Sequence, residues 1–286
     1  MRIIWTILLS LLSVQLFAFE DKHLDIGTFN IAWLGDGDND KINRSELDYK
    51  RITEIIIESG VDLLALQEVE NAGSLDRLLK YLPDWAYQIG SSGREQNLAF
   101  LYKKEISILE FSEYMPLIVK ADRTRPGFWA YMRKGNFDFY IMNIHFKSTS
   151  RYDNTKAKKI ESFKLRRNQA KALKVWADSL ISLNIDDDII ILGDMNDHPK
   201  RKRGNLDPIY KNEKLKFISS NLVSCKNPDW DSIDHIVITQ SVTERKISFS
   251  ERIYNQYFSF QEDSANKISD HCMIIFSVDI NQKDND

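Results

Sequence analysis

The amino-acid sequence predicts an α/β fold in which two β-sheets pack together and helices cover their outer faces. Three observations lead to this prediction. Both halves of the 286-residue chain contain several apolar runs of strand length, and each half also contains helical patterns. No internal repeat and no Pro-, Gly- or Ser-rich linker separates the halves, which indicates one large domain.

Residues 1–18 form a segment of different character. Arg2 precedes the apolar run IIWTILLSLLSVQLFA, which is too short and too N-terminal for a typical membrane span. This pattern predicts a signal peptide cleaved near Ala18, so that residues 19–286 form a mature domain that is exported to the periplasm or secreted. An uncleaved anchor is the alternative, and the exact cleavage site stays open because Leu16 is not small.

In the first half, a strand is expected at 23–34, where HLDIGTFNIAWL alternates and then becomes continuously apolar. A helix should begin after Ser45, because Asp48 stands at capping-box spacing, and it should end at Gly60. The remaining patterns predict a buried strand at 62–67, a short helix at 74–82, and strands at 86–90, 97–104 and 106–111.

In the second half, FWAYMRKG and FDFYIMNIHF predict a hairpin that turns at Lys134-Gly135-Asn136. A long amphipathic helix is expected from about Thr155 to Leu183. Strands should follow at 187–194, 232–239 and 271–280. The apolar side of the long helix is expected to consist of Ile160, Phe163, Leu165, Leu173, Val175, Trp176 and Leu180.

The charge is nearly balanced overall but uneven along the chain. The net charge is −3, so the whole molecule is not a general binder of nucleic acid. Residues 147–174 contain ten Lys/Arg against two acidic residues, and a run of four basic residues follows at 200–203. These segments suit an anionic substrate, although a solvated helix face and a charged loop would have the same composition.

The two cysteines, Cys225 and Cys272, leave two alternatives open. In an oxidising compartment they can form one disulfide, whereas Cys272 in a strand-like run can equally be a buried free thiol. Neither has partners at the spacing of zinc ligands, which argues against a structural zinc site.

Polar residues recur at or just past the ends of the strand-like runs. They are Asn30 in TFNIAWL, Glu68 in LLALQEVE, Asn143 and His145 in YIMNIHFKS, Asp194 and Asn196 in IIILGDMNDHP, Asp234 in SIDHIVIT, and Asp270 and His271 in ISDHCMIIF. Ligands of α/β proteins collect at such a rim. Carboxylates, amides and imidazoles together suit a hard metal ion and a phosphate.

Three of these residues are predicted metal ligands. Glu68 follows a buried strand directly, where a carboxylate is costly unless it is paired or binds a cation. Asn30 is expected to assist it, and Asp270 is assigned to the metal or to positioning of water. Mg²⁺ fits best because it takes few carboxylates and retains waters, while Mn²⁺ or Ca²⁺ stays open. Glu68 alone would be no more than an exposed strand-end acid.

Five residues are expected to act on the substrate. Asp194 and the amide of Asn196 can hold an attacking water without placing two charges side by side, although the same residues favour ordinary turns. Asp234 is expected to keep His271 protonated and oriented toward a phosphate oxygen. His145 suits stabilisation or protonation of the leaving oxygen.

Two further residues, Arg125 in TRPGFWA and Asn143, are candidate contacts to the substrate phosphate. Arg125 precedes a proline, which disfavours a helix, and a surface arginine is the alternative. His235 should point to the opposite face from Asp234 and is treated as non-catalytic.

The ordered set TFNIAWL, LLALQEVE, TRPGFWA, NIHFKS, GDMND, SIDHIVI and SDHCMIIF resembles the endonuclease/exonuclease/phosphatase superfamily from about His23 to Val278. The resemblance implies a four-layer α/β sandwich, with two packed mixed β-sheets flanked by helices, and metal-dependent hydrolysis of phosphate esters by a catalytic domain at 19–286. Within the superfamily the chain looks most similar to deoxyribonuclease-like, secreted bacterial members. Ala32 replaces the aspartate that the AP-endonuclease branch has two positions after Asn30, which argues against a repair enzyme.

By the same resemblance, Asn30 and Glu68 match the metal-site pair, and Asp270 matches a neighbouring acid associated with the metal. Asp194 and Asn196 match the pair that activates water and contacts phosphate, Asp234 and His271 match an Asp–His couple, and His145 and Arg125 match residues near the phosphate.

The predicted function is therefore that of an exported, Mg²⁺-dependent phosphodiesterase, a nuclease acting on DNA or RNA. A phospholipid phosphodiesterase of sphingomyelinase type, with membrane lipid as its substrate, or an inositol phosphate phosphatase is the alternative; a catalytically silent binding module fits less well. No protein partner is inferred.

Overall fold

The computed structural model describes residues 22–183 and 185–284 and confirms the two-sheet α/β sandwich. The predicted signal peptide lies outside the described residues. The first sheet has the strand order β11-β12-β1-β2-β4-β3 and the second has the order β5-β6-β7-β8-β10-β9. In the described part of the chain, no helix is both long enough and apolar enough to span a bilayer.

The strands of the first sheet are β1 (His23–Leu34), β2 (Leu63–Val69), β3 (Trp85–Ile89), β4 (Asn97–Lys103), β11 (Arg252–Tyr254) and β12 (Met273–Asp279). Those of the second are β5 (Ser107–Tyr114), β6 (Gly127–Lys134), β7 (Phe137–His145), β8 (Ile189–Asp194), β9 (Lys216–Phe217) and β10 (Asp234–Ile238). The helices are α1 (Glu46–Ser59), α2 (Ala72–Leu79), α3 (Lys156–Leu183), α4 (Asp207–Tyr210), α5 (Gln240–Arg245), α6 (Gln256–Ser259) and α7 (Glu262–Ile268), with a 3₁₀ turn at Met115–Leu117.

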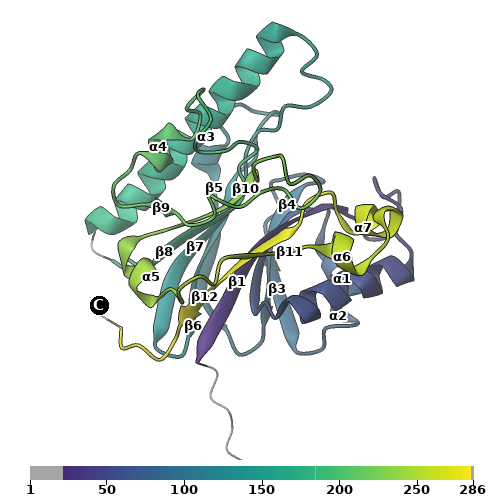
Figure 1. The fold of residues 1–286 in the computed structure, drawn as a ribbon, viewed down its shortest axis with the longest axis horizontal. Coiled ribbons are helices and arrows are strands. Elements are labelled where there is room, and N and C mark those ends of the chain that lie inside the picture. Colours follow the sequence, from purple (N-terminus) through teal and green to yellow (C-terminus); the bar gives the residue numbers. More distant parts are fainter. Residues whose placement is uncertain (1–21, 184, 285–286) are drawn as a thin grey trace, which may run out of the picture.

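Apolar residues on both faces of the central strands produce the layers. Because successive side chains point to opposite faces of a sheet, one set packs between the two sheets and the other packs against the helices outside. In β2, Leu63 and Ala65 face the core between the sheets, whereas Leu64 and Leu66 pack toward α1. Figure 1 shows the resulting arrangement, with α1, α2, α6 and α7 beyond the first sheet and α3 and α4 beyond the second. The fold is therefore a four-layer sandwich.

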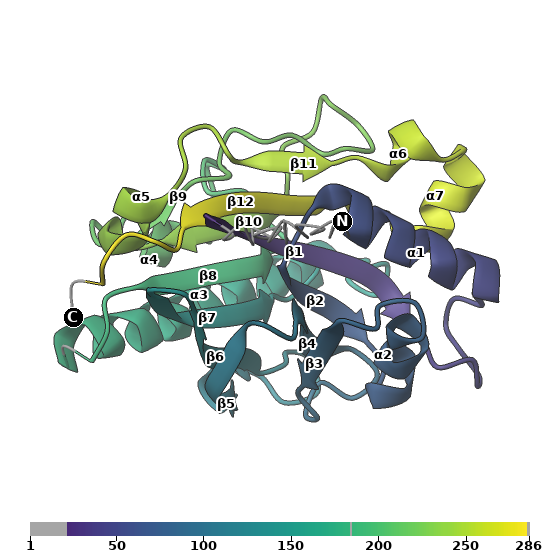
Figure 2. The ribbon, with the colours of Figure 1, turned by 90° about the horizontal axis from the view of Figure 1, so that it is seen from below.

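Each sheet contains one parallel pair at its centre. β1 and β2 are parallel and are connected through α1, while β7 and β8 are parallel and are connected through α3. Since crossovers of this kind return the chain to the same edge, the carboxyl ends of each parallel pair lie together. Figure 2 shows β1 and β2 beside β7 and β8 in the stacked sheets.

The predicted ends of helix α1 and the predicted hairpin turn are confirmed. Ser45 caps α1 through a full capping box with Asp48, and Gly60 ends the helix in the left-handed conformation with φ 73°. The hairpin of β6 and β7 turns at Gly135, whose φ is 62°.

The predicted apolar side of α3 was partly wrong. Ile160 and Val175 are 42% and 58% exposed, whereas Arg166 and Gln169 are buried. Val175 lies two residues from Leu173 and therefore on another side of the helix, away from the sheet. The polar side chains are buried because they bind the loop after β7: Gln169 accepts from Lys147 N–H, and Arg166 donates to the Lys147 carbonyl.

The structure resolves the question of the two cysteines. Cys225 and Cys272 form a disulfide, so neither is a free thiol. Cys272 directly precedes β12 rather than lying within it, and Cys225 belongs to an irregular segment between β9 and β10.

Candidate active site

Seven of the ten predicted site residues line one cavity of about 480 Å³, termed here the central cavity. These seven are Asn30, Glu68, His145, Asp194, Asn196, Asp270 and His271. They come from the two parallel strand pairs, from the turn after β8 and from the segment before β12. The topology thus brings together groups that lie far apart in the sequence.

Asn30 sits where β1 leaves regular geometry. Pairing between β1 and β2 shifts register after Asn30, and Ala32 and Trp33 have positive φ values of 48° and 57°. The Asn30 Oδ1 accepts from the Ala32 N–H at 3.0 Å, and its Nδ2 donates to Asp194 Oδ2 at 3.1 Å. A bulge at the site edge therefore turns the Asn30 amide into the cavity.

Buried Arg44 holds this bulge in place. Its guanidinium donates to the carbonyls of Ile31, Ala32 and Trp33 on one side and to those of Lys267 and Ile268 on the other. The fork geometry of arginine allows this many donations at once. Arg44 therefore ties the bulge of β1 to the end of α7, which directly precedes the segment carrying Asp270.

Glu68 occupies a strained position beside Asn30. Its φ is 65°, in the left-handed region that few non-glycine residues adopt, and such strain is common at functional sites. Burial raises the pKa of its carboxyl, and the nearby charge of Arg125 partly offsets this effect. The Glu68 Oε1 lies 3.5 Å from Asn30 Nδ2 and 3.7 Å from His145 Nε2.

Asp194 ends β8 and is the central carboxylate of the site. Its Oδ1 accepts from the Asn196 N–H at 2.8 Å, and its Oδ2 accepts from the side-chain amides of Asn196 and Asn30. Burial and the charge of Asp234 raise the pKa of Asp194 to about 7. A carboxyl with this pKa can exchange a proton with water near neutral pH.

Gly193 makes the approach of β8 to β7 possible. Its φ is 139°, and a Cβ at this position would collide with the carbonyl oxygen of Ile144. The strand therefore reaches its end close against β7, and Asp194 comes beside His145.

His145 is a neutral donor rather than a cation. Burial, together with the charges of Arg125 and His271, lowers its pKa well below the usual 6.5. The Nε2 lies 3.4 Å from Asp194 Oδ2, while the Nδ1 is buried without a hydrogen-bond partner in the described structure. The predicted role of His145 at the leaving oxygen stays a prediction, and in this environment it would act as an N–H donor.

His271 carries the positive charge of the site. Its Nδ1 lies 2.8 Å from Asp234 Oδ2, which is the pairing expected from the sequence. Burial opposes protonation, but Asp234, Asp194 and Asp270 outweigh this effect and raise the pKa of His271 to about 10. The imidazolium Nε2 is then free to face a phosphate oxygen, with Asp270 Oδ1 4.0 Å away.

Two predicted phosphate contacts are not in the cavity lining. Asn143 is fully buried beneath the site, where its Nδ2 donates to the carbonyls of Leu66 and Ala99 and its Oδ1 accepts from Gln67. The assignment of Asn143 to phosphate binding was therefore wrong, because each of its polar atoms is already bonded between the two sheets. Half-buried Arg125 donates to the Gln96 side chain and acts on Glu68 and Asp194 through its charge.

The donor set fits a divalent cation that prefers oxygen ligands. Glu68 is a carboxylate with its side chain 13% exposed, and no lysine or arginine within the described residues forms an ion pair with it. Asn30 lies beside it with Nδ2 toward the Glu68 carboxylate, and its Oδ1, which accepts from the Ala32 N–H, retains a second lone pair that would reach an ion if the side chain rotated. Asp194, Asp234 and His271 also offer ligand atoms within 4.8 Å of one another, but the Asp234–His271 hydrogen bond makes Glu68 and Asn30 the better metal pair.

Three residues of the site were missed by sequence reasoning. Ser269 Oγ donates to the Asn30 carbonyl at 2.6 Å and accepts from the His271 N–H. It therefore connects strand β1 to the segment before β12. Arg44 lies in a polar loop, and Lys226 at the cavity edge lies in a segment without regular structure. No periodicity marks any of them; the only usable signal was the serine immediately before Asp270-His271.

Comparisons with known proteins agree with this fold. The profile of the Endonuclease/Exonuclease/phosphatase family matches residues 27–271, a span that contains all ten predicted site residues. No curated protein matches the sequence.

Several solved structures share the fold over 90% of this chain. They include the endonuclease/exonuclease/phosphatase from Bacteroides vulgatus (TM-score 0.65, 17% identity, 98% of that chain covered) and D. rerio TDP2 complexed with single strand DNA product (0.63, 16%, 99%). The human Nocturnin catalytic domain with bound sulfate anion is also similar (0.63, 13%, 94%). Because the family profile spans most of the sequence, the chain belongs to the endonuclease/exonuclease/phosphatase family.

Proposed function

We propose that this protein is an exported, Mg²⁺-dependent phosphodiesterase that hydrolyses nucleic acid. The chain belongs to a family of metal-dependent phosphoester hydrolases. The observation that carries the proposal is that one cavity brings together two carboxylates, those of Glu68 and Asp194, and His271, whose Nδ1 lies 2.8 Å from Asp234. This arrangement offers a cation site, a water-activating base and a fixed positive charge around one position.

Each side chain has a task that follows from its environment. Asp194, held by Asn196 and Asn30, aligns water and accepts its proton. The imidazolium of His271, fixed by Asp234, donates to a phosphoryl oxygen as negative charge develops there. Neutral His145 donates its N–H toward the same centre. Glu68 and Asn30 would hold the metal ion, which when bound polarises the phosphate.

A nucleic acid substrate is supported by two observations. The solved structure of D. rerio TDP2, which shares this fold, contains a single strand DNA product. Basic side chains of 200–203 are exposed near α3, whereas Lys147 and Arg166 of the other basic stretch are largely buried and hold loops. The basic surface available to a polyanion is therefore smaller than the sequence indicates.

Lipid substrates have less support. The aromatic residues considered as a membrane contact are Trp33, Phe128 and Trp129; Phe128 is 2% exposed and the two tryptophans are half-buried. The assay described next includes phospholipid and inositol phosphate as substrates. A silent binding module is disfavoured because the catalytic set is complete.

The test is an assay of purified mature protein on plasmid DNA, RNA, sphingomyelin and inositol phosphates, with Mg²⁺ or with EDTA. Nicking of DNA or RNA that EDTA abolishes is expected. His271→Ala should lower kcat by about 10²- to 10³-fold, whereas His23→Ala, an exposed histidine on the edge of the fold, should not. Cleavage of lipid alone, or no turnover on any of these substrates, would overturn the nuclease proposal.

Export is tested separately. Expression of the complete chain followed by mass spectrometry of the product should find a mature protein that begins just after Ala18, outside the cytoplasm. An intact residue 1–18 segment in a cytoplasmic fraction would contradict export without touching the proposed chemistry.

A further inference from the structure

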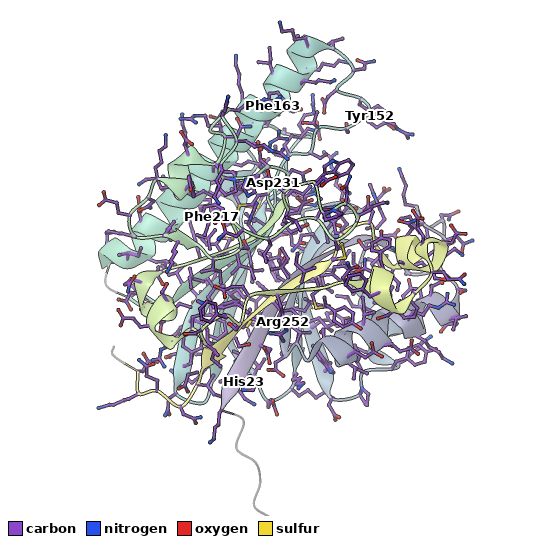
Figure 3. The ribbon with its side chains drawn as sticks, in the orientation of Figure 1. His23, Tyr152, Phe163, Phe217, Asp231 and Arg252 are labelled. Carbon is purple, nitrogen blue, oxygen red and sulfur yellow. A yellow bond between two sulfur atoms is a disulfide. The ribbon has the colours of Figure 1, made fainter. Side chains whose placement is uncertain are left out.

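A second cavity of about 450 Å³ adjoins the central cavity and shares Lys226, Asp270 and His271 with it. The rest of its wall comes mainly from residues 223–233, termed here the tethered segment, and from Ile253 and Ile274. Where the central cavity is lined mostly by polar groups, this one combines an aromatic and aliphatic surface with charged residues, among them Arg201 and Asp231. Asp231 of the tethered segment is labelled in Figure 3, between the helices of the two outer layers.

The tethered segment contains no helix or strand of its own. Its backbone is held by a few bonds, such as Ser224 N–H to the Trp230 carbonyl at 2.7 Å and Ser232 N–H to the Leu222 carbonyl at 3.2 Å. Val223 and Trp230 are 42% and 62% exposed, so apolar burial contributes little to its position.

The covalent anchor of this segment is placed at the catalytic histidine. Cys225 is bonded to Cys272, the residue directly after His271. Lys226, the next residue, donates to Asn266 Oδ1 at 2.9 Å and thereby stands on the boundary of the two cavities. The disulfide, together with the bond from Ser224 N–H to the Trp230 carbonyl, therefore ties the segment that carries Lys226 and Trp230 to the residue next to His271.

The second cavity has the groups needed to bind the nucleotide next to a scissile phosphate. A phosphodiester held against His271 carries an organic group on each side of phosphorus, and the second cavity, which shares Lys226, Asp270 and His271 with the central one, has room for one of these groups. An exposed tryptophan offers a face on which a planar base can stack, and Lys226 offers a charge for the next phosphate.

Resting on the proposed nuclease function, we propose that the Cys225–Cys272 disulfide is a positioning element for substrate. It holds the tethered segment so that Trp230 and Lys226 bind the nucleotide adjacent to the scissile phosphodiester. Affinity for an oligonucleotide then depends on the disulfide, while the phosphate site itself does not.

The experiment compares Trp230→Ala and the double variant Cys225→Ser/Cys272→Ser with the wild type. KM is measured for a single-stranded oligonucleotide, and inorganic phosphate is used as a competitive inhibitor that reports on the central cavity alone. We expect KM to rise about tenfold or more in both variants, from loss of base stacking, with the inhibition constant of phosphate unchanged. Phe249→Ala, which removes a 98% exposed ring toward the other end of β12, is the matched control and should change neither value.

Lys226 is tested by salt dependence. Lys226→Ala should reduce the slope of log affinity against log salt by about one, the amount expected for one lost phosphate contact. Lys104→Ala removes an exposed lysine that donates to the Pro83 carbonyl and lines neither cavity, so it should leave the slope unchanged.

An unchanged KM in Trp230→Ala overturns the proposal. So does a double variant in which kcat and phosphate inhibition fall together with oligonucleotide affinity, because the disulfide would then only support His271. If the double variant does not fold, the two exposed positions Trp230 and Lys226 decide the question. If the wild type cleaves no diester, the nuclease function fails, and oligonucleotide binding by anisotropy in wild type and Trp230→Ala still tests the second cavity.

Discussion

At the scale of single residues, the two histidines of the cavity differ because of their neighbours. His271 has a carboxylate 2.8 Å from its Nδ1, which raises its pKa and favours the protonated form. His145 is enclosed, its Nδ1 has no hydrogen-bond partner among residues 22–183 and 185–284, and its lowered pKa favours the neutral form. The sequence indicated that both histidines stand at strand ends. It could not indicate which would be charged, because that depends on burial and on carboxylates supplied by other strands.

Asp234→Asn should move the whole pH profile of kcat toward acid. In the wild type, Asp234 overcomes the effect of burial on His271, whose pKa is raised to about 10, and together with burial raises the pKa of Asp194 to about 7. Without that charge both pKa values fall, so the acidic and alkaline limbs should each shift downward by about one unit or more. The measurement is kcat against pH at saturating substrate; an alkaline limb that stays in place would contradict the assignment of His271.

Asn143 shows why a polar residue in a motif can be structural. Its amide joins β2 and β4 of the first sheet to β7 of the second. Asn143→Leu should lower the free energy of unfolding by about 3 kcal/mol or more, because two carbonyls and the Gln67 amide lose buried partners. Urea unfolding followed by circular dichroism measures this loss. Exposed Asn136→Ala should cost far less, and equal costs would refute the buried role.

At the scale of elements, the long strands and helices could be predicted from the sequence. Burial of one whole face of such an element produces a clear periodic pattern of apolar residues. β1, β2, β7 and β8 and the helices α1 and α3 lie close to their expected positions. The short elements between 205 and 268, among them α4, β9, β11 and α6, were not predicted. They have two to four residues each and are held by tertiary bonds, such as Gln256 Nε2 to the carbonyls of Ser269 and His271, which leave no local pattern.

Gly193→Ala should damage both the fold and the site. The backbone at φ 139° is strained for any residue with a Cβ, and the added methyl would meet the Ile144 carbonyl. The strained conformation alone costs about 1–3 kcal/mol, and relief of the clash would displace Asp194 from His145. Thermal unfolding should show the loss in stability and activity assays the loss in kcat. Gly60→Ala, whose Cβ would meet no neighbouring atom but which also has a positive φ, is the control for strain without a clash.

The disulfide between the tethered segment and β12 should also contribute to stability. It closes a loop with a sequence separation of 47, for which the chain-entropy relation gives about 4 kcal/mol as an upper value. Urea unfolding with and without reductant should therefore show a lower midpoint in the reduced protein. The Cys225→Ser/Cys272→Ser variant should not respond to reductant, and a response there would point to an effect other than disulfide cleavage.

At the scale of the whole molecule, the two sheets pack so that residues at one edge of each sheet form a single candidate site. The first sheet contributes Asn30, Glu68 and His271, and the second contributes His145, Asp194 and Asp234. The convergence of these residues could be predicted because their motifs stand in a recognisable order. The supporting contacts of Arg44, Ser269 and the tethered segment could not be predicted. Each of them depends on how two loops that are distant in the sequence pack against each other.

Mg²⁺ should stabilise the whole fold through this shared rim. A ligand at one hundred times its Kd adds about 2.7 kcal/mol to the free energy of unfolding, so Tm should rise with added Mg²⁺ and fall with EDTA. In Glu68→Gln this response should disappear, since the variant lacks the carboxylate that is to hold the ion. A Tm response equal to that of the wild type would exclude Glu68 as the main ligand, whatever the activity of the variant.

The bond between Ser269 Oγ and the Asn30 carbonyl, and the place of β12 between β11 and β1, have a consequence for synthesis of the chain. Asn30 and His271 are 241 positions apart, so the cavity that they line is complete only after β12, synthesised last among the strands, has paired with β1. A product truncated before β12 therefore lacks part of the candidate site. Completion of the site and closure of the first sheet are then one and the same folding step.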